Sequence, residues 1–142
     1  MTRIEFFFNV ENKLQKVADL SEKAVSKGRR LVVFTPDTEL TFKLEHFLWT
    51  HPAIGFMPHC RAESELAPVT PIIIDSLGTQ LPHDDVLINL QNQHPPFFSR
   101  FTRLIEIVGM DEADKAAART RYSFYRDRGY DIKTFDAQGA AL

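Results

Sequence analysis

Short, almost wholly apolar runs alternate along this chain with longer stretches in which apolar residues recur every three or four positions. The short runs are typical of strands buried on both faces of a sheet, and the longer stretches are typical of helices with one buried face. The predicted strands are residues 4–10, 31–34, 72–74, 86–90 and 103–108, and a further short segment, 130–135, follows the last helix.

Three segments have the helical pattern. In the first, the period is carried by Leu14, Val17, Ala18, Ala24 and Val25, and the helix is expected to end at Gly28. The second spans residues 38–49, and the third spans residues 111–128 and ends at Gly129. Because strands and helices alternate, we expect an α/β fold, a mostly parallel sheet in a three-layer α/β/α domain of residues 1–136, with 137–142 as a flexible tail.

Composition narrows the classes of function. The chain has 142 residues and a formal net charge of -2, so no global positive field draws it to nucleic acid, and anion binding requires a local patch. The single cysteine, Cys60, excludes an internal disulfide and fits a reducing compartment. The sequence shows neither a signal peptide nor an apolar run long enough to span a membrane, so we expect a cytoplasmic protein.

A parallel α/β domain raises the question of a nucleotide site, but the phosphate-binding motifs are missing. The six glycines form neither G-x-G-x-x-G nor G-x-x-x-x-G-K-[ST], and Glu11, just after the first strand, would repel a phosphate. We therefore expect a Rossmann-like fold without a nucleotide-binding loop and without a cofactor. A nucleotide-binding enzyme of unknown reaction is the alternative, and it rests on fold analogy alone.

Other chemistry is weakly supported. His59 and Cys60, with Glu63 and Glu65 nearby, offer metal ligands, but a polar surface loop over residues 59–69 explains them more simply. His83 precedes two aspartates in what reads as a turn. No serine or cysteine has the surroundings of a nucleophile, so we predict no catalytic residue and no metal site.

The last helix carries two stripes. One is expected to face the core and consists of Ala113, Ala117, Thr120 and Phe124. The other, nearly opposite, consists of Lys115, Arg119, Tyr122 and Arg126. Cations around an aromatic ring suit an acidic peptide with hydrophobic residues, whereas a solvated face is the simpler interpretation. Direct binding of single-stranded DNA through Tyr122, Tyr125 and the arginines is a further alternative.

The second helix also has two apolar sides. Leu40, Leu44 and Phe47 form one, and Phe42, His46 and Trp49 form the other. One side must serve the core. The other is either covered by residues 50–58 or docks another subunit.

Several segments, in this order and spacing, resemble one known family over nearly the whole chain. They are Gly28-Arg29-Arg30-Leu31-Val32-Val33, Leu48-Trp49-Thr50-His51-Pro52 with Phe56-Met57-Pro58-His59, Asp85-Val86-Leu87-Ile88-Asn89-Leu90, and Arg121-Tyr122-Ser123-Phe124-Tyr125-Arg126 with Gly129-Tyr130. The family is the chi subunit of bacterial DNA polymerase III, an accessory protein of the clamp-loader complex. The resemblance implies a nucleotide-binding type of fold that lacks the nucleotide site.

The resemblance also implies a function. Chi proteins are not enzymes; they bind the acidic, Phe-ending C-terminal tail of single-stranded DNA-binding protein, and in many bacteria a psi subunit tethers them to the clamp loader. Direct DNA binding is expected to be weak. The tail-binding positions implied by similarity are Phe56, Val108, Lys115, Arg119, Tyr122, Arg126 and Thr134, with Arg119 as the central cation. Ser123 stands where the family is often basic. A psi surface at Phe42, His46 and Trp49 is inferred from helix geometry alone.

Overall fold

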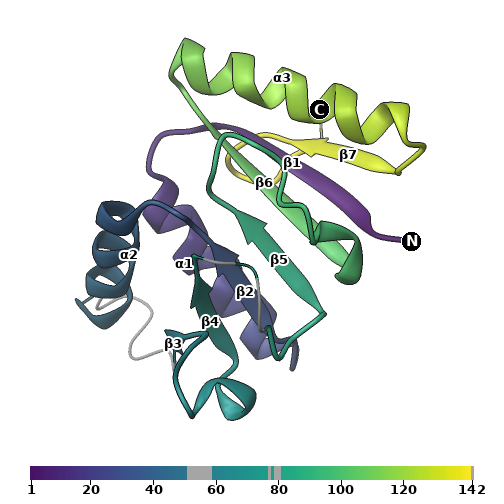
Figure 1. Cartoon of the computed structure of the whole chain (residues 1–142). Coiled ribbons are helices and arrows are strands. Elements are labelled where there is room, and N and C mark those ends of the chain that lie inside the picture. The colour runs from purple at the N-terminus through teal and green to yellow at the C-terminus, as the bar shows by residue number, and fades with distance from the viewer. Residues whose placement is uncertain (51–58, 77, 79–80, 142) are drawn as a thin grey trace.

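The structure is a computed structural model that describes residues 1–50, 59–76, 78 and 81–141, with only the backbone for residues 49 and 50. The described residues form a seven-stranded parallel sheet with the strand order β3-β4-β2-β5-β6-β1-β7 (Figure 1). The strands are β1 (Arg3–Val10), β2 (Leu31–Phe34), β3 (His59–Arg61), β4 (Ile72–Asp75), β5 (Val86–Asn89), β6 (Arg103–Gly109) and β7 (Ile132–Phe135).

Helices cover both faces of the sheet, as predicted. Helices α1 (Lys13–Ser26) and α2 (Thr38–Thr50) lie on one face, and α3 (Glu112–Asp127) lies on the other (Figure 1). Two apolar clusters result, because successive residues of a strand point to opposite faces. One contains Phe7 and Ile105 with residues of α1 and α2, and the other contains Phe6, Leu104 and residues of α3. The three-layer α/β/α prediction is confirmed.

Two short 3-10 helices complete the α3 side. They are η1 (Ala67–Val69) and η2 (Phe98–Arg100). Ala67 and Phe98 from these turns are buried in the same apolar cluster as α3. The connection from β5 to β6 therefore covers the sheet beside α3, where a regular helix is absent from the described residues.

Residues 59–61 differ from the prediction. The sequence indicates a polar loop there, but the structure has the edge strand β3, in which Cys60 pairs with Ile73 of β4. All three residues of β3 are half-buried. A three-residue edge strand is held by backbone pairing to one neighbour, so its side chains need no apolar pattern.

The predicted core face of α3 was wrong. Ala118, Arg121 and Tyr125 are the buried residues of this helix, whereas Ala113 and Thr120 are exposed. The remaining members of the predicted face, Ala117 and Phe124, are half-buried. The core face therefore lies between the two predicted stripes, because a buried carboxylate of β6 meets Arg121.

Candidate functional site

Helix α3 is tied at its first turn to the strand before it and to α1. The Asp111 carboxylate caps the helix by accepting from the backbone N–H of Ala113 at 3.4 Å. The Asp114 carboxylate accepts from the N–H of Gly109 at 2.5 Å and from the Lys13 ammonium at 2.8 Å. Burial raises the pKa of Asp114, but these two hydrogen bonds outweigh it and hold the pKa below its ordinary value.

A buried polar cluster fixes the rotation of α3 about its own axis. The Glu106 carboxylate, completely buried on β6, accepts hydrogen bonds from Arg121 Nε at 3.0 Å, from the Tyr125 hydroxyl at 2.6 Å and from Asn89 Nδ2 at 3.0 Å. Arg121 also donates to the carbonyl of Asn92 at 2.8 Å. Arg121 and Tyr125 both belong to α3, so a rotation of the helix about its axis would break both of their bonds to Glu106.

Burial raises the pKa of Glu106 to about 7, against the opposing effect of the Arg121 guanidinium. Burial also raises the pKa of Tyr125, so its hydroxyl stays neutral and acts as a donor. The cluster is therefore built from one titratable acceptor and donors that keep their protons.

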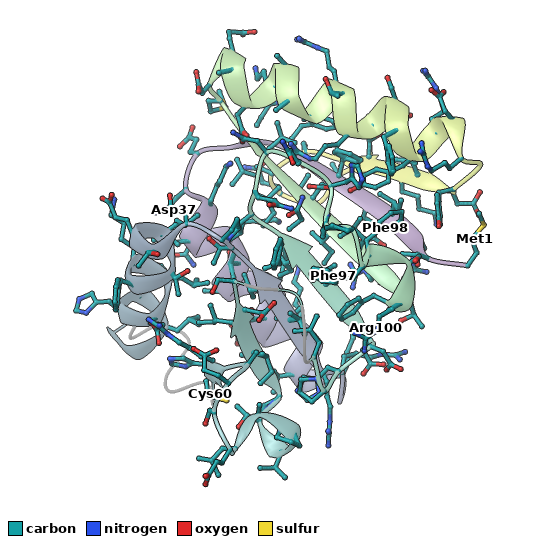
Figure 2. All side chains as sticks on the ribbon, in the orientation of Figure 1. Met1, Asp37, Cys60, Phe97, Phe98 and Arg100 are labelled. Atoms are coloured by element: carbon teal, nitrogen blue, oxygen red, sulfur yellow. The ribbon has the colours of Figure 1, made fainter. Side chains whose placement is uncertain are left out.

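One flank of α3 is covered by aromatic and cationic contacts. The Phe124 ring stacks on His94 at 3.6 Å between centroids, and the Arg128 guanidinium carbon lies 3.6 Å from the same centroid. Both groups cannot occupy one face of the ring, so Phe124 lies between them. Burial, and then the Arg128 charge, lower the pKa of His94. This flank belongs to the packing against the β5–β6 connection (Figure 2, where Phe97 and Phe98 mark it).

The other flank carries the predicted basic and aromatic stripe, Lys115, Arg119, Tyr122 and Arg126. Tyr122 is half-buried and packs on Phe6 of β1 with ring centroids 5.5 Å apart. Arg119 and Arg126 are exposed, and Lys115 is half-buried. Arg126 has only a 3.4 Å contact with the exposed Asp127, and Lys115 and Arg119 form no ion pair within the described part of the chain.

Strands β1 and β7 form the floor next to this stripe. Thr134 pairs in register with Phe6, so its side chain lies on the α3 side of the sheet. Phe8 is half-buried and stacks on Phe6 at 5.7 Å. Phe8 is absent from the predicted site. The sequence does contain a signal for it, because Phe8 lies two positions after Phe6 in one strand and therefore points to the same face of the sheet.

The other predicted residues stand apart from this surface. Val108 of β6 is completely buried in the apolar cluster against which Tyr122 packs, so its side chain is closed to a ligand. Phe56 lies outside the described residues. Ser123 is half-buried next to Tyr122 in the helix. The site that the structure brings together is thus Tyr122, Phe8 and Thr134 beside three cations, which matches carboxylates next to an apolar side chain.

The second predicted surface lies on α2. Leu44 and Leu48 are buried against the sheet, whereas Phe42 is 59% exposed and His46 is exposed. The Arg61 guanidinium carbon lies 5.0 Å from the Phe42 ring centroid, and Arg61 also pairs with Glu45 at 2.6 Å. The side chain of Trp49 lies outside the described residues.

The remaining candidates have structural surroundings. His83 is buried, and its Nε2 lies 2.6 Å from the Thr70 carbonyl. Cys60 is half-buried in β3. Across residues 1–50, 59–76, 78 and 81–141, no group of three metal-ligating side chains is found. In the same residues no helix is long and apolar enough to cross a membrane.

This chain is similar to proteins of one family over most of its length. Residues 1–133 match the family described as DNA polymerase III chi subunit, HolC. The DNA polymerase III subunit chi of Pseudomonas aeruginosa is 33% identical over 94% of this chain and 95% of its own length. The subunits of the same name from Haemophilus influenzae and Escherichia coli are 30% and 27% identical, over 92% and 84% of this chain and 94% and 82% of their own lengths.

Solved structures share the fold. The C-terminal domain of Dbp5 from S. cerevisiae, in a complex with Gle1, aligns over 96% of this chain and 91% of its own length with a TM-score of 0.65. A longer form of Dbp5 aligns over 93% of this chain and 41% of its own, with a TM-score of 0.60. At 10% and 11% sequence identity, these two structures support the α/β architecture alone.

Proposed function

Because this chain belongs to the DNA polymerase III chi subunit family, we propose that it is a non-catalytic adaptor of the replication machinery. Its ligand is the acidic C-terminal tail of single-stranded DNA-binding protein. Its second task is to connect that protein with the clamp loader.

The observation that carries the proposal is the exposed flank of α3. Its arginine and lysine residues share a flank of the helix with Tyr122, which packs on Phe6, and two of the three cations lack an ion-pair partner among the described residues. An unpaired cation on the surface retains its capacity for a ligand carboxylate, and guanidinium groups bind carboxylates with two parallel hydrogen bonds.

Each part of the tail then has its own contact. Arg119 takes the central carboxylate, and Lys115 and Arg126 take the flanking acidic residues. The terminal Phe ring packs against Tyr122 and Phe8 beside Thr134. Val108 acts indirectly, since it is completely buried in the apolar cluster against which Tyr122 packs.

Titration of a fluorescently labelled acidic peptide ending in Phe tests the proposal. We expect Arg119→Ala to weaken binding at least about tenfold, because a charged hydrogen bond contributes about 1.5–3 kcal/mol. We expect Lys43→Ala to leave affinity unchanged, because Lys43 is an exposed cation of α2 that pairs with Glu39. Binding should weaken with salt and when the terminal carboxylate is amidated. No binding to the wild-type protein at low salt would exclude this function.

The exposed side of α2 is the proposed surface for the second partner, the psi subunit. Phe42 supports this assignment because its ring is 59% exposed, and exposed aromatic surface of this size is typical of positions that a partner covers. Phe42→Ala should weaken co-purification with psi and leave binding of the acidic tail peptide intact. If it weakens both equally, the α2 surface has no separate role.

A further inference from the structure

A basic cavity lies at the amino edge of the sheet, on the α1 side and therefore on the face opposite α3. It has a volume of about 500 Å³ and is bounded by the start of β1, the start of β6 and the last turns of α1. We call it the amino-edge cavity. Five cationic residues line it, and they are Arg3, Lys23, Lys27, Arg29 and Arg103.

Two of these cations are held in place by a buried carboxylate. Glu5, which is 5% exposed, accepts from Arg103 Nη2 at 2.5 Å with one oxygen, and its other oxygen lies 3.2 Å from Arg3 Nε. Each guanidinium has five donors, so both retain donors for a ligand. Glu5 therefore fixes the position of both guanidinium groups and leaves some of their N–H donors available to a ligand.

The other three cations are not neutralised by their surroundings. Lys23, Lys27 and Arg29 are exposed, and they form no ion pair among the residues that the structure describes. Cations at a helix C-terminus commonly offset the helix dipole, but that dipole amounts to roughly half a charge. Arg3, Arg29 and Arg103 also come from segments other than α1. Five cationic residues and no acidic residue line the cavity, in a protein with a net charge of -2.

The lining indicates the class of anion. Leu20, Ala24 and Val86 are buried residues that contribute apolar surface to it, and none of the lining residues is aromatic. A site for the bases of a nucleic acid strand uses aromatic rings for stacking, so this cavity offers nothing to a base. Several cationic residues that line one concave space instead fit several negative charges close together.

We propose that the amino-edge cavity binds a compact anion of two or three linked phosphates. The phosphates are held by the exposed lysines and Arg29 on one side and by Arg3 and Arg103 on the other. The source of this chemistry is either free polyphosphate or the phosphate end of a nucleotide, with the base outside the cavity. The proposal does not depend on the tail-binding function of α3.

Tripolyphosphate is the probe, and the full chain is titrated with it by calorimetry and by thermal unfolding at low salt. The test variant is Lys27→Gln with Arg29→Gln, two exposed residues whose replacement breaks no ion pair of the described structure. The matched control is Lys115→Gln with Arg119→Gln, which removes the same number of charges from α3. Potassium sulfate at equal ionic strength controls for nonspecific screening.

The expected result is saturable binding of tripolyphosphate that raises the melting temperature of the wild-type protein and of the α3 control. Affinity should fall at least about tenfold in the cavity variant, since it loses two of the charged contacts. A nucleoside triphosphate that binds as tightly as tripolyphosphate identifies the nucleotide as a source, and one that binds much more weakly identifies free polyphosphate.

Three outcomes would overturn the proposal. The first is no response of the wild-type protein to tripolyphosphate. The second is an equal loss of affinity in both double variants, which would reflect net charge rather than the cavity. The third is binding of a single-stranded oligonucleotide without binding of tripolyphosphate, which would assign this surface to an extended strand.

Discussion

Glu106 shows what one side chain contributes to the position of a surface that it does not reach. It is buried under α3. Its carboxylate accepts hydrogen bonds from two side chains of the helix and from one side chain of β5. The α3 flank with Tyr122 and Arg119 has its orientation because Arg121 points down into this cluster. The buried acid is therefore a structural determinant of the proposed tail site.

Glu106→Gln should lower the free energy of unfolding, and the gap to wild type should depend on pH. The pKa of this carboxyl is about 7 in the folded protein and 4.5 ordinarily, so the folded state binds the proton more tightly than the unfolded state between these values. The stability that Glu106 contributes is then fully present below pH 4.5 and declines toward pH 7, by about 3 kcal/mol for a shift of this size.

Chemical denaturation of both proteins at several pH values between 4 and 8 measures this gap. We expect it to narrow as pH rises. A gap that widens with pH would show that the ionised carboxylate is the form better matched to its donors.

Arg121→Met alone should destabilise the protein by about 3–5 kcal/mol, because it leaves a buried carboxylate without its cation. The double variant Glu106→Gln with Arg121→Met should recover most of that loss, since it removes both buried charges while the Gln oxygen can still accept from Tyr125 and Asn89. Urea unfolding measures both. If the single and double variants are equally destabilised, the ion pair itself stabilises the protein, and the loss in the single variant is not only the cost of an unpaired buried charge.

Arg121 and Tyr125 show what helical periodicity could not predict about α3. A charged residue such as Arg121 is assigned to solvent by helical periodicity, and only its partner fifteen positions earlier makes it a core residue. Tyr125 is buried for the same reason. The grouping of Lys115, Arg119, Tyr122 and Arg126 on one side of α3 follows from their spacing alone, which requires no knowledge of the partner.

At the scale of elements, the uniform apolar runs predicted the central strands well. β2, β4 and β5 are buried on both faces, and an almost wholly apolar composition is enough to identify such strands in a sequence. β3 was missed because an edge strand of three half-buried residues has no such signature. The floor at Phe8 was also missed, since the contact of β1 with α3 joins segments more than a hundred residues apart.

The start of α3 offers an element-scale prediction. Asp114→Ala should lower the free energy of unfolding by about 1–3 kcal/mol at neutral pH, because the Gly109 N–H loses its acceptor and Lys13 loses its partner. The folded pKa of Asp114 is depressed, so this contribution is present above the ordinary pKa of 3.8 and is lost as pH falls through the depressed value.

Urea unfolding at pH 7 and near pH 3 measures the effect of Asp114→Ala, and the difference from wild type should shrink at the lower pH. Asp111→Ala is the control. Its cap bond is 3.4 Å long and exposed, so its loss should cost less. A larger loss from Asp111→Ala would mean that capping, and not the connection to β6 and α1, secures the helix.

At the scale of the whole molecule, the two proposed sites are separated by the sheet. The tail surface lies on the α3 face, and the amino-edge cavity lies on the α1 face. Saturation with tripolyphosphate should therefore change the affinity for the acidic tail peptide by less than about twofold at constant ionic strength, since two distant sites without shared contacts are nearly independent. Fluorescence titration of the peptide in both conditions measures this. Competition between the two ligands would place them on one surface.

The position of β1 in the sheet has a consequence for synthesis of the protein. Among the described strands β1 comes first in the sequence, yet its neighbours on either side are β6 and β7, which come last. Until those residues leave the ribosome, the Phe6-Phe7-Phe8 run has no partner strand, and such apolar segments are prone to aggregate. Nascent chains that stall before residue 103 should therefore be poor folders and good substrates for chaperones that bind exposed aromatic segments.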